Sequence, residues 1–248
     1  MRLLALDTST DRMSVAVGRL RDGQPRVWSA QGAGGAQASR ELIPMIRNLM
    51  AQADLAFAEL DAIVFGRGPG AFTGLRTACA VAQGLALGAR PLAQQASLPV
   101  LPLDSLLAVA EQARRHRAPA KQPWEVVALL DARMDQIYLA SYRWEADQWH
   151  TLQPPILARP QDIGVQPGQA LAGNVFETYG ARLPPASKGQ PWIAAWPTAE
   201  ALLQLAPTRL AQGHGVDPAL ALPLYIRDKV ASTTAERAAA KVAQAQGS

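Results

Sequence analysis

Apolar and polar residues alternate along the first hundred residues with the periods of strands and helices. Leu3 to Leu6 form an apolar run that ends at Asp7, and an alternating segment follows a short polar turn. A later segment, "ASRELIPMIRNLMAQA", has apolar residues at helical spacing with charges between them. These periods predict strands at 3–7, 13–20, 27–28 and 61–66 and a helix at 39–53.

The strand–Asp–turn–strand pattern occurs a second time. "EVVALLDARMDQIYLASYRW" repeats the order of "RLLALDTSTDRMSVAVGRL", with Asp131 in the place of Asp7. We interpret this as an internal duplication. It predicts an α/β fold of two ribonuclease H-like lobes facing each other across a cleft, as in the actin, hexokinase and heat-shock ATPase superfamily. The expected division is an N-terminal lobe at 1–105, rejoined by about 222–232, a C-terminal lobe at 106–221, and a flexible tail at 233–248.

A glycine-rich loop precedes a helix expected from about Thr73: "VFGRGPGAFTGLRTACAVAQGLALG", Val64 to Gly88. Glycines let backbone amides converge on an anion, and the helix adds the positive end of its dipole. An equal alternative is that the glycines only allow a tight turn and close helix packing. The polar residues after the first strand are equally ambiguous between phosphate binding and turn formation, and Asp131 and Asp135 share this ambiguity. The candidate residues for a weak ATP or ADP site are Asp7, Ser9, Gly68, Gly70, Thr73 and Gly74.

Three other nucleotide or metal motifs do not fit. A Walker A loop ends in Gly-Lys-Ser/Thr, but Gly74 is followed by Leu75 and Arg76. The dinucleotide fingerprint needs an acid about 20 residues downstream, and no carboxylate occurs between Asp61 and Asp104. The three histidines are too dispersed for a helical ligand pair. We therefore expect no structural metal and no zinc protease.

Composition narrows the class of protein. Hydrophobic residues make up 49% and charged residues 18% of 248 residues, enough for a packed core. The net charge of +4 is mild and the basic residues are scattered, so it is weak evidence for nucleic acid binding. Cys79 is the single cysteine, which excludes an internal disulfide, and we expect it to be buried. No segment resembles a signal peptide or a membrane span, so a soluble, cytoplasmic protein is expected.

Five segments together resemble one bacterial family. They are "LALDTSTDRMSVAVG", "RELIPMIRNLM", "GRGPGAFTGLRTACAVAQGLALG", "LLDARMDQIYLASY" and "PLYIRDKVA", in this order between residues 3 and about 231. The chain is similar to the TsaB proteins, also called YeaZ. The resemblance implies a non-catalytic scaffold for the paralogous subunit TsaD, which forms N6-threonylcarbamoyladenosine at position 37 of tRNAs that read ANN codons. It also implies that the small ATPase TsaE completes the modification machinery, and that tRNA is bound through the complex.

The resemblance also indicates what this chain lacks. TsaD-type enzymes carry a His-x3-His metal motif after the glycine helix, and the aligned positions here are Ser105 and Val109. The family usually has serine where this chain has Ala71, which removes one hydroxyl from the loop. We therefore expect no catalytic residue in this chain. The alternative is an ATPase or small-molecule kinase that uses Asp7 and the glycine loop.

Two helices are candidates for the partner surface. The helix at 39–53 is apolar nearly all round, and the helix after the glycine loop has small residues that allow close helix approach. The alternative is that both are simply buried in their own lobe. A four-helix bundle with TsaD, as the resemblance implies, or a homodimer of the isolated chain would cover such a face. The residues expected there are Leu42, Met45, Ile46, Leu49, Met50, Arg76, Ala80 and Gly84.

Overall fold

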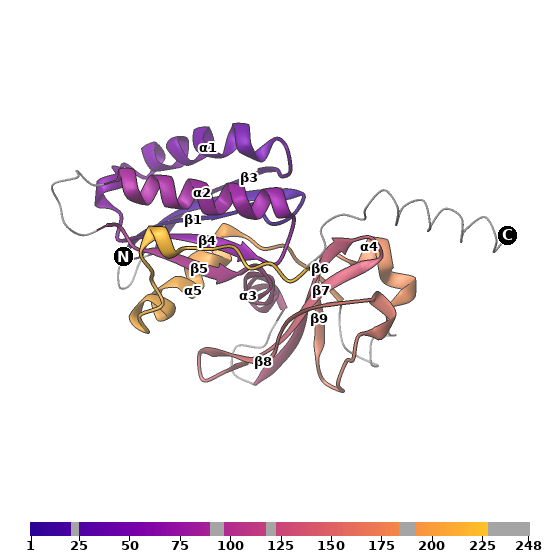
Figure 1. Ribbon diagram of the computed structural model, residues 1–248. Helices are drawn as coiled ribbons and strands as arrows, with labels where there is room; N and C mark the ends of the chain where they lie inside the picture. The colour runs from indigo at the N-terminus through magenta and orange to yellow at the C-terminus, as the bar shows by residue number, and fades with distance from the viewer. Residues whose placement is uncertain (21–24, 90–96, 118–122, 184–191, 228–248) are drawn as a thin grey trace.

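Two five-stranded mixed sheets form the framework of the chain (Figure 1). The computed structural model describes residues 1–20, 25–89, 97–117, 123–183 and 192–227. The first sheet, in the order β3-β2-β1-β4-β5, contains β1 (Arg2–Asp7), β2 (Arg12–Arg19), β3 (Arg26–Ala33), β4 (Ala62–Gly68) and β5 (Val100–Asp104). The second, in the order β10-β9-β6-β7-β8, contains β6 (Trp124–Arg133), β7 (Gln136–Glu145), β8 (Gln148–Ala158), β9 (Ala170–Gly173) and β10 (Trp192–Ala194).

The two sheets have the same topology. In the first, β1 pairs antiparallel with β2 and parallel with β4. In the second, β6 pairs antiparallel with β7 and parallel with β9. Read from β8, the second sheet therefore repeats the order and directions of the first read from β3. The predicted duplication and the α/β, actin-like fold class are confirmed.

Helices cover both faces of the first sheet (Figure 1). On one face lie α1 (Ala38–Gln52) and α2 (Phe72–Gly88), and on the other lie α3 (Ser105–Arg117) and α5 (Ala199–Ala211). Side chains of β1 pack into the cores on both faces of the sheet. Leu4 and Leu6 point into the core under α1 and α2, and the alternate residues Leu3 and Ala5 point toward α3 and α5. The short α4 (Phe176–Tyr179) packs on the second sheet. No helix in these described segments is long and apolar enough to cross a membrane.

Helix α5 returns to the first sheet late in the chain. The backbone N–H of Ala199 donates to Ser14 Oγ at 2.9 Å, and Ser29 on β3 donates to Glu200. Helix α5 therefore packs with the first sheet, although its residues fall within 106–221, the range expected for the C-terminal lobe. Contacts between residues so far apart in sequence have no local signal. The expected tail at 233–248 lies outside the described residues.

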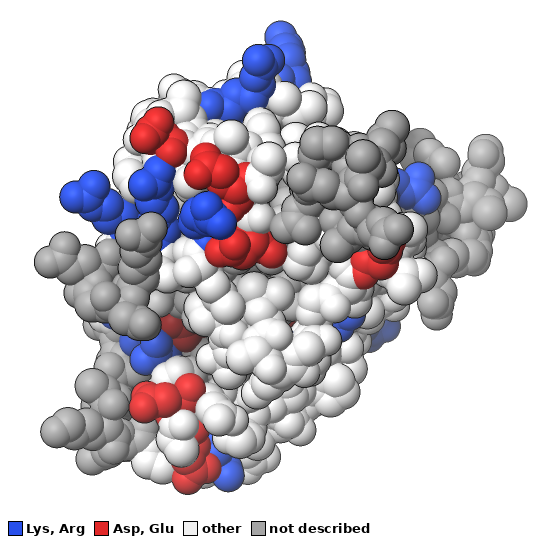
Figure 2. All heavy atoms as spheres, turned by 90° about the vertical axis from the view of Figure 1, so that its left-hand side faces the viewer, with Lys and Arg blue, Asp and Glu red and all other residues white. Residues whose placement is uncertain are grey.

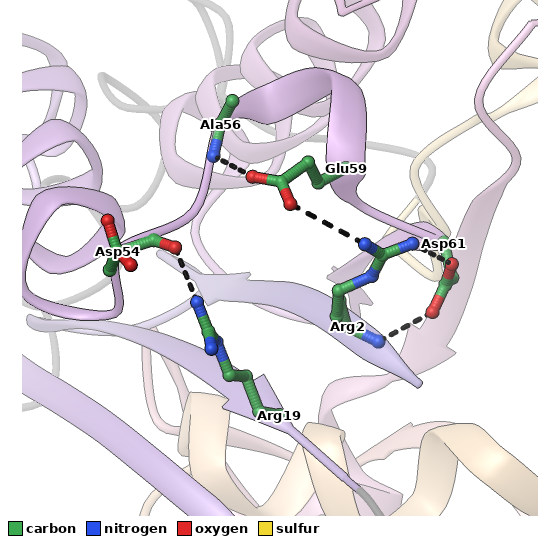
Figure 3. A network of polar contacts seen from close by, with 6 residues as sticks. All are labelled: Arg2, Arg19, Asp54, Ala56, Glu59 and Asp61. Atoms are coloured by element: carbon green, nitrogen blue, oxygen red, sulfur yellow. Dashed lines mark hydrogen bonds and ion pairs between the residues drawn. The ribbon is translucent and has the colours of Figure 1, made fainter.

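An ion-pair network fastens the end of the first lobe that carries the amino end of β1 (Figure 3). Arg2 lies 3.6 Å from Glu59 and 3.3 Å from Asp61, and its backbone N–H also donates to Asp61 at 2.7 Å. Glu59 accepts from the N–H of Ala56 at 2.8 Å, while Arg19 donates to the carbonyl of Asp54. The connection between α1 and β4 is thereby tied to β1 and β2. This end is polar, and the chemistry suggested by the sequence lies at the other end of β1.

The orientation of α1 can be tested with two of its isoleucines, one buried and one exposed. Ile46 is fully buried beneath α1, whereas Ile43 on the same helix is 46% exposed. We expect Ile46→Ala to lower the free energy of unfolding by about 2–5 kcal/mol because it leaves a cavity. Ile43→Ala should change it by less than about 0.5 kcal/mol. Urea denaturation measures both, and equal losses would contradict the described orientation of α1.

Candidate functional site: the glycine loop and the outer helices

The glycine loop packs directly against the turn that follows β1. A Cβ added at Gly74 would overlap the carbonyl oxygen of Thr8, and one at Gly70 would overlap that of Ser9. The Thr8 hydroxyl donates to the Gly74 carbonyl at 2.7 Å, and the N–H of Ala71 donates to the Ser9 carbonyl at 2.7 Å. The glycines therefore allow contact between two segments of this chain. Part of the space where an anion could approach the loop is filled by the turn itself.

Asp7 lies beneath this contact and is completely buried. Its Oδ1 accepts the N–H of Ser9 at 2.8 Å and the Ser9 hydroxyl at 2.6 Å, while Oδ2 accepts the Ser105 hydroxyl at 2.9 Å. Gly66 leaves room for the carboxylate, because a Cβ there would overlap Oδ2. Burial raises the pKa of Asp7 from its ordinary value of 3.8 to about 6, although the hydrogen bonds from Ser9 and Ser105 oppose the increase. Asp7 thus connects β1 to the start of α3.

The remaining candidates of the loop are dispersed. Gly68 has a positive φ of 114°, which a glycine adopts without strain, and a Cβ there would lie 2.8 Å from the Leu224 carbonyl oxygen. Thr73 is exposed on α2, and its carbonyl accepts the Thr77 hydroxyl at 3.0 Å. Of the six nucleotide candidates, Gly70 alone lines the neighbouring cleft of about 320 Å³. The structure does not bring these six residues together around one open space.

The cleft lies between the loop and the second lobe. Its other walls come from the β6–β7 turn and from residues 224–227. Arg227 bridges them, donating to the carbonyl of Arg133 at 3.3 Å and to Gln136 Oε1 at 2.6 Å. The segment 224–227 is also attached to the first lobe, because the N–H of Leu224 donates to the Arg67 carbonyl at 2.7 Å.

The turn between β6 and β7 in the second lobe corresponds to the turn that follows Asp7 in the first. Asp131 accepts the N–H of Arg133 at 2.7 Å and the hydroxyl of Tyr179 at 3.0 Å. Asp135 is exposed and pairs with Arg182 at 2.8 Å. Both acids are therefore engaged by groups of their own lobe.

The two positions that we aligned with the His-x3-His motif of TsaD-type enzymes face the interior of this chain. Ser105 and Val109 are fully buried, and Ser105 is bonded to Asp7. The described residues contain no group of three or more His, Cys, Asp or Glu side chains suited to hold a metal. Cys79 is buried as predicted, donates to the carbonyl of Ala221 at 3.2 Å, and has a pKa raised by burial.

The expected partner residues divide into two groups. Four of them lie in the core that α1 forms with the first sheet, with at most 3% of each residue exposed: Leu42, Ile46, Leu49 and Met50. Met45 is half-buried. The other three lie on α2, where Arg76, Ala80 and Gly84 are exposed. For the first four, the structure favours the alternative of burial within their own lobe.

An exposed stripe runs along the outside of α2. Ala80, Gly84 and Leu87, which is 58% exposed, follow one another at helical spacing. Arg76 stands at the start of the stripe, with its guanidinium 3.9 Å from the ring centre of Phe72 and 3.2 Å from the Tyr225 hydroxyl. The sequence predicted Arg76 at the partner surface, and in the structure these contacts within the chain engage its guanidinium.

Apolar residues of the adjoining C-terminal segment widen this surface. Leu220 and Leu222 are 70% and 67% exposed. Gln83 on α2 donates to the carbonyls of Pro218 and Ala221 at 2.9 and 3.1 Å, so the segment is attached to α2. Sequence reasoning missed both leucines, because nothing in the local pattern places residues 218–222 beside α2. We call Ala80, Gly84, Leu87, Leu220 and Leu222 the outer apolar surface.

Comparison with known proteins gives consistent results. The family model of TsaD, described as tRNA N6-adenosine threonylcarbamoyltransferase, matches residues 35–205. The protein named tRNA threonylcarbamoyladenosine biosynthesis protein TsaB from Escherichia coli K12 is 31% identical over 93% of this chain and 96% of its own length. The protein of the same name from Haemophilus influenzae is 32% identical over 93% of this chain and 95% of its own.

A solved structure gives the same result at the level of the fold. YeaZ from Pseudomonas aeruginosa superposes with a TM-score of 0.76 at 35% sequence identity, covering 90% of this chain and 99% of that one. The family model spans the glycine loop and the second strand–Asp–turn unit, and the three relatives cover at least 90% of this chain. The chain belongs to the TsaB (YeaZ) family.

Proposed function

We propose that this protein takes part in the biosynthesis of N6-threonylcarbamoyladenosine in tRNA, as the names of its curated relatives indicate. Within that pathway it acts as a non-catalytic subunit that binds and activates a TsaD-type enzyme, which modifies position 37 of tRNAs reading ANN codons. The packing of the glycine loop against Thr8 and Ser9 is the observation that carries this proposal. The close contacts of the loop are made with the turn after β1 of the same chain.

The alternative, an ATPase or kinase, requires Asp7 to reach a metal-bound phosphate or an attacking water. Asp7 has no exposed surface and three hydrogen bonds within the chain. Phosphoryl transfer depends on charged groups placed around the transferred phosphate. Releasing Asp7 for this role would break the link between β1 and α3. The scaffold role therefore fits the buried carboxylate better.

The outer apolar surface is the proposed binding site for the TsaD-type partner. Small residues at Ala80 and Gly84 allow another helix to approach α2 closely, and Leu87 provides an exposed side chain to bury. A stable interface would bury a total of about 1,200–2,000 Å². In the absence of the partner, a second copy of the chain can cover the same surface, which is the basis for the expected homodimer.

The remaining participants follow from this assignment. We propose that a TsaE-type ATPase joins the complex and that the assembly works in the cytoplasm. Among the described residues on the face shown in Figure 2, cations and anions are interspersed and form no continuous basic track. That distribution is consistent with tRNA being held mainly through the complex.

The partner surface can be tested by a charge placed at Leu87, its large exposed side chain on α2. Leu87→Glu should abolish co-purification with a TsaD-type partner, because an unpaired charge would be buried in the interface. Leu152→Glu is the matched control, since Leu152 is 43% exposed on β8 of the other lobe. The same mixtures are assayed for threonylcarbamoyladenosine in tRNA, and activity should be lost with Leu87→Glu alone. Normal complex formation by Leu87→Glu would rule out this surface.

The structural role of Asp7 predicts a dependence of stability on pH. The pKa of Asp7 is about 6 in the folded chain against 3.8 ordinarily, so the folded state binds the proton more tightly. Its contribution to stability is therefore greatest below about pH 4 and falls as the pH rises through 6, by a total of about 3 kcal/mol. Asp7→Asn stays neutral and should remove this decline. Urea denaturation of both proteins at several pH values between 4 and 7 measures the difference.

The same variant separates the scaffold from the enzyme. Asp7→Asn should retain partner binding and tRNA modification in the mixture, since the amide can accept from Ser9 and donate to the Ser105 hydroxyl. ATP turnover by the purified wild-type chain that disappears in Asp7→Asn would instead establish the ATPase alternative.

A further inference from the structure

A second cavity lies away from the glycine loop, between α3, α5 and the β7–β8 hairpin. It has a volume of about 310 Å³, at the lower end of the range for small-molecule sites. Its walls combine charged groups with amides and aromatic rings, and they include Gln148, Gln204, Gln212 and Thr208. Nothing in the function proposed above uses this cavity.

One wall is built around a buried ion pair. Glu111 is 2% exposed and accepts from Arg114 Nε and Nη2, both at 2.9 Å, and from the Trp149 indole N–H at 2.9 Å. The Arg114 guanidinium in turn lies 4.0 Å from the ring centre of Trp144. The three contacts at Glu111 hold this guanidinium in a fixed place. The paired guanidinium lines the cavity and offers a flat surface for stacking.

The opposite wall carries a cation available for a ligand. Arg209 on α5 is half-buried, and its guanidinium has no ion pair or hydrogen bond with the rest of the described chain. Asp147, at the tip of the hairpin, is exposed and likewise lines the cavity. Since Arg114 and Glu111 neutralise each other, Arg209 and Asp147 are the charges left to recognise a ligand.

We propose that this cavity binds one nucleotide unit. Arg209 binds the phosphate, Asp147 accepts from ribose hydroxyls, and the base stacks on the Arg114–Trp144 pair within reach of the glutamine amides. Arginine planes and aromatic rings are the surfaces on which proteins stack unpaired bases. The nucleotide can belong to single-stranded RNA or be free in solution. The RNA source, which we favour, rests on the proposed role in tRNA modification.

The position of the cavity is compatible with partner binding. Helices α3 and α5 lie on the face of the first sheet opposite α1 and α2 (Figure 1). A ligand between α3, α5 and the hairpin therefore does not compete with a protein docked on α2. The subunit can contact RNA on one side and its partner on the other.

The test titrates the full-length chain with adenosine 5′-monophosphate and, separately, with a short labelled single-stranded RNA. Trp144 and Trp149 lie at the cavity, so quenching of intrinsic fluorescence reports binding of either probe. Arg209→Glu should weaken binding at least about tenfold and lower the salt dependence of RNA binding by about one counterion. Arg159→Glu makes the same charge change at an exposed site and should leave binding unaltered. Thermal unfolding by circular dichroism verifies that both variants are folded.

Each outcome decides between specific alternatives. Binding of RNA alone supports an RNA nucleotide, and binding of the monophosphate as well supports a site for the free nucleotide. Absence of binding for both probes, or equal weakening by Arg159→Glu, overturns the proposal. Co-purification of Arg209→Glu with the TsaD-type partner should be normal. Failure of the nucleotide site is therefore distinguishable from failure of the proposed scaffold role.

Discussion

The close packing of the glycine loop on the turn after β1 determines the arrangement of the first lobe. Two backbone segments approach so closely that side chains at Gly70 and Gly74 would collide with the carbonyls of Ser9 and Thr8. Burying the Asp7 carboxylate beneath them is unfavourable, and its hydrogen bonds with Ser9 and Ser105 offset part of that cost. The strand, the loop and the start of α3 are therefore positioned by a single polar cluster. Such close packing suits a subunit whose proposed role is to present a surface.

The features that could be predicted from the sequence are those that depend on a local pattern of residues. The strand–Asp–turn–strand unit is short and strongly periodic, so both copies and the duplication could be identified from the sequence alone. Contacts over long sequence distances could not. Gly66 accommodates Asp7, and Ser105 bonds to it across 98 residues, yet neither residue carries a local signal for the other. Strand β8 was also missed, because Pro154 and Pro155 discourage a strand assignment and are tolerated at the edge of a sheet.

The orientation of the outer helices shows a second limit. Residues on both sides of α2 are small: Ala78 and Ala82 are buried while Ala80 and Gly84 are exposed. A small side chain fits a close-packed core as well as a contact between subunits, so the pattern alone could not assign the two faces. The sequence suggested that α1 is apolar nearly all round, but the helix is amphipathic: Leu42, Ile46 and Leu49 lie in the core, while the opposite face is polar and exposed. Ile43 is the large aliphatic residue left outside on α1.

The two lobes share a core, and this constrains how they can move. Ala5 and Val64 of the first sheet belong to the same buried cluster as Ala128 and Ala172 of the second, together with residues of α3 and α5. Arg12 at the start of β2 also stacks on Trp196, at 3.6 Å from its ring centre, beyond the last strand of the second sheet. Hinge closure around a ligand requires lobes that separate along an interface with few packed contacts. Opening this chain would expose apolar side chains from both sheets at once, at about 25 cal/mol for each Å². This energetic cost opposes a cycle of opening and closing, in agreement with the proposed role of a subunit that contributes its surfaces to a larger complex.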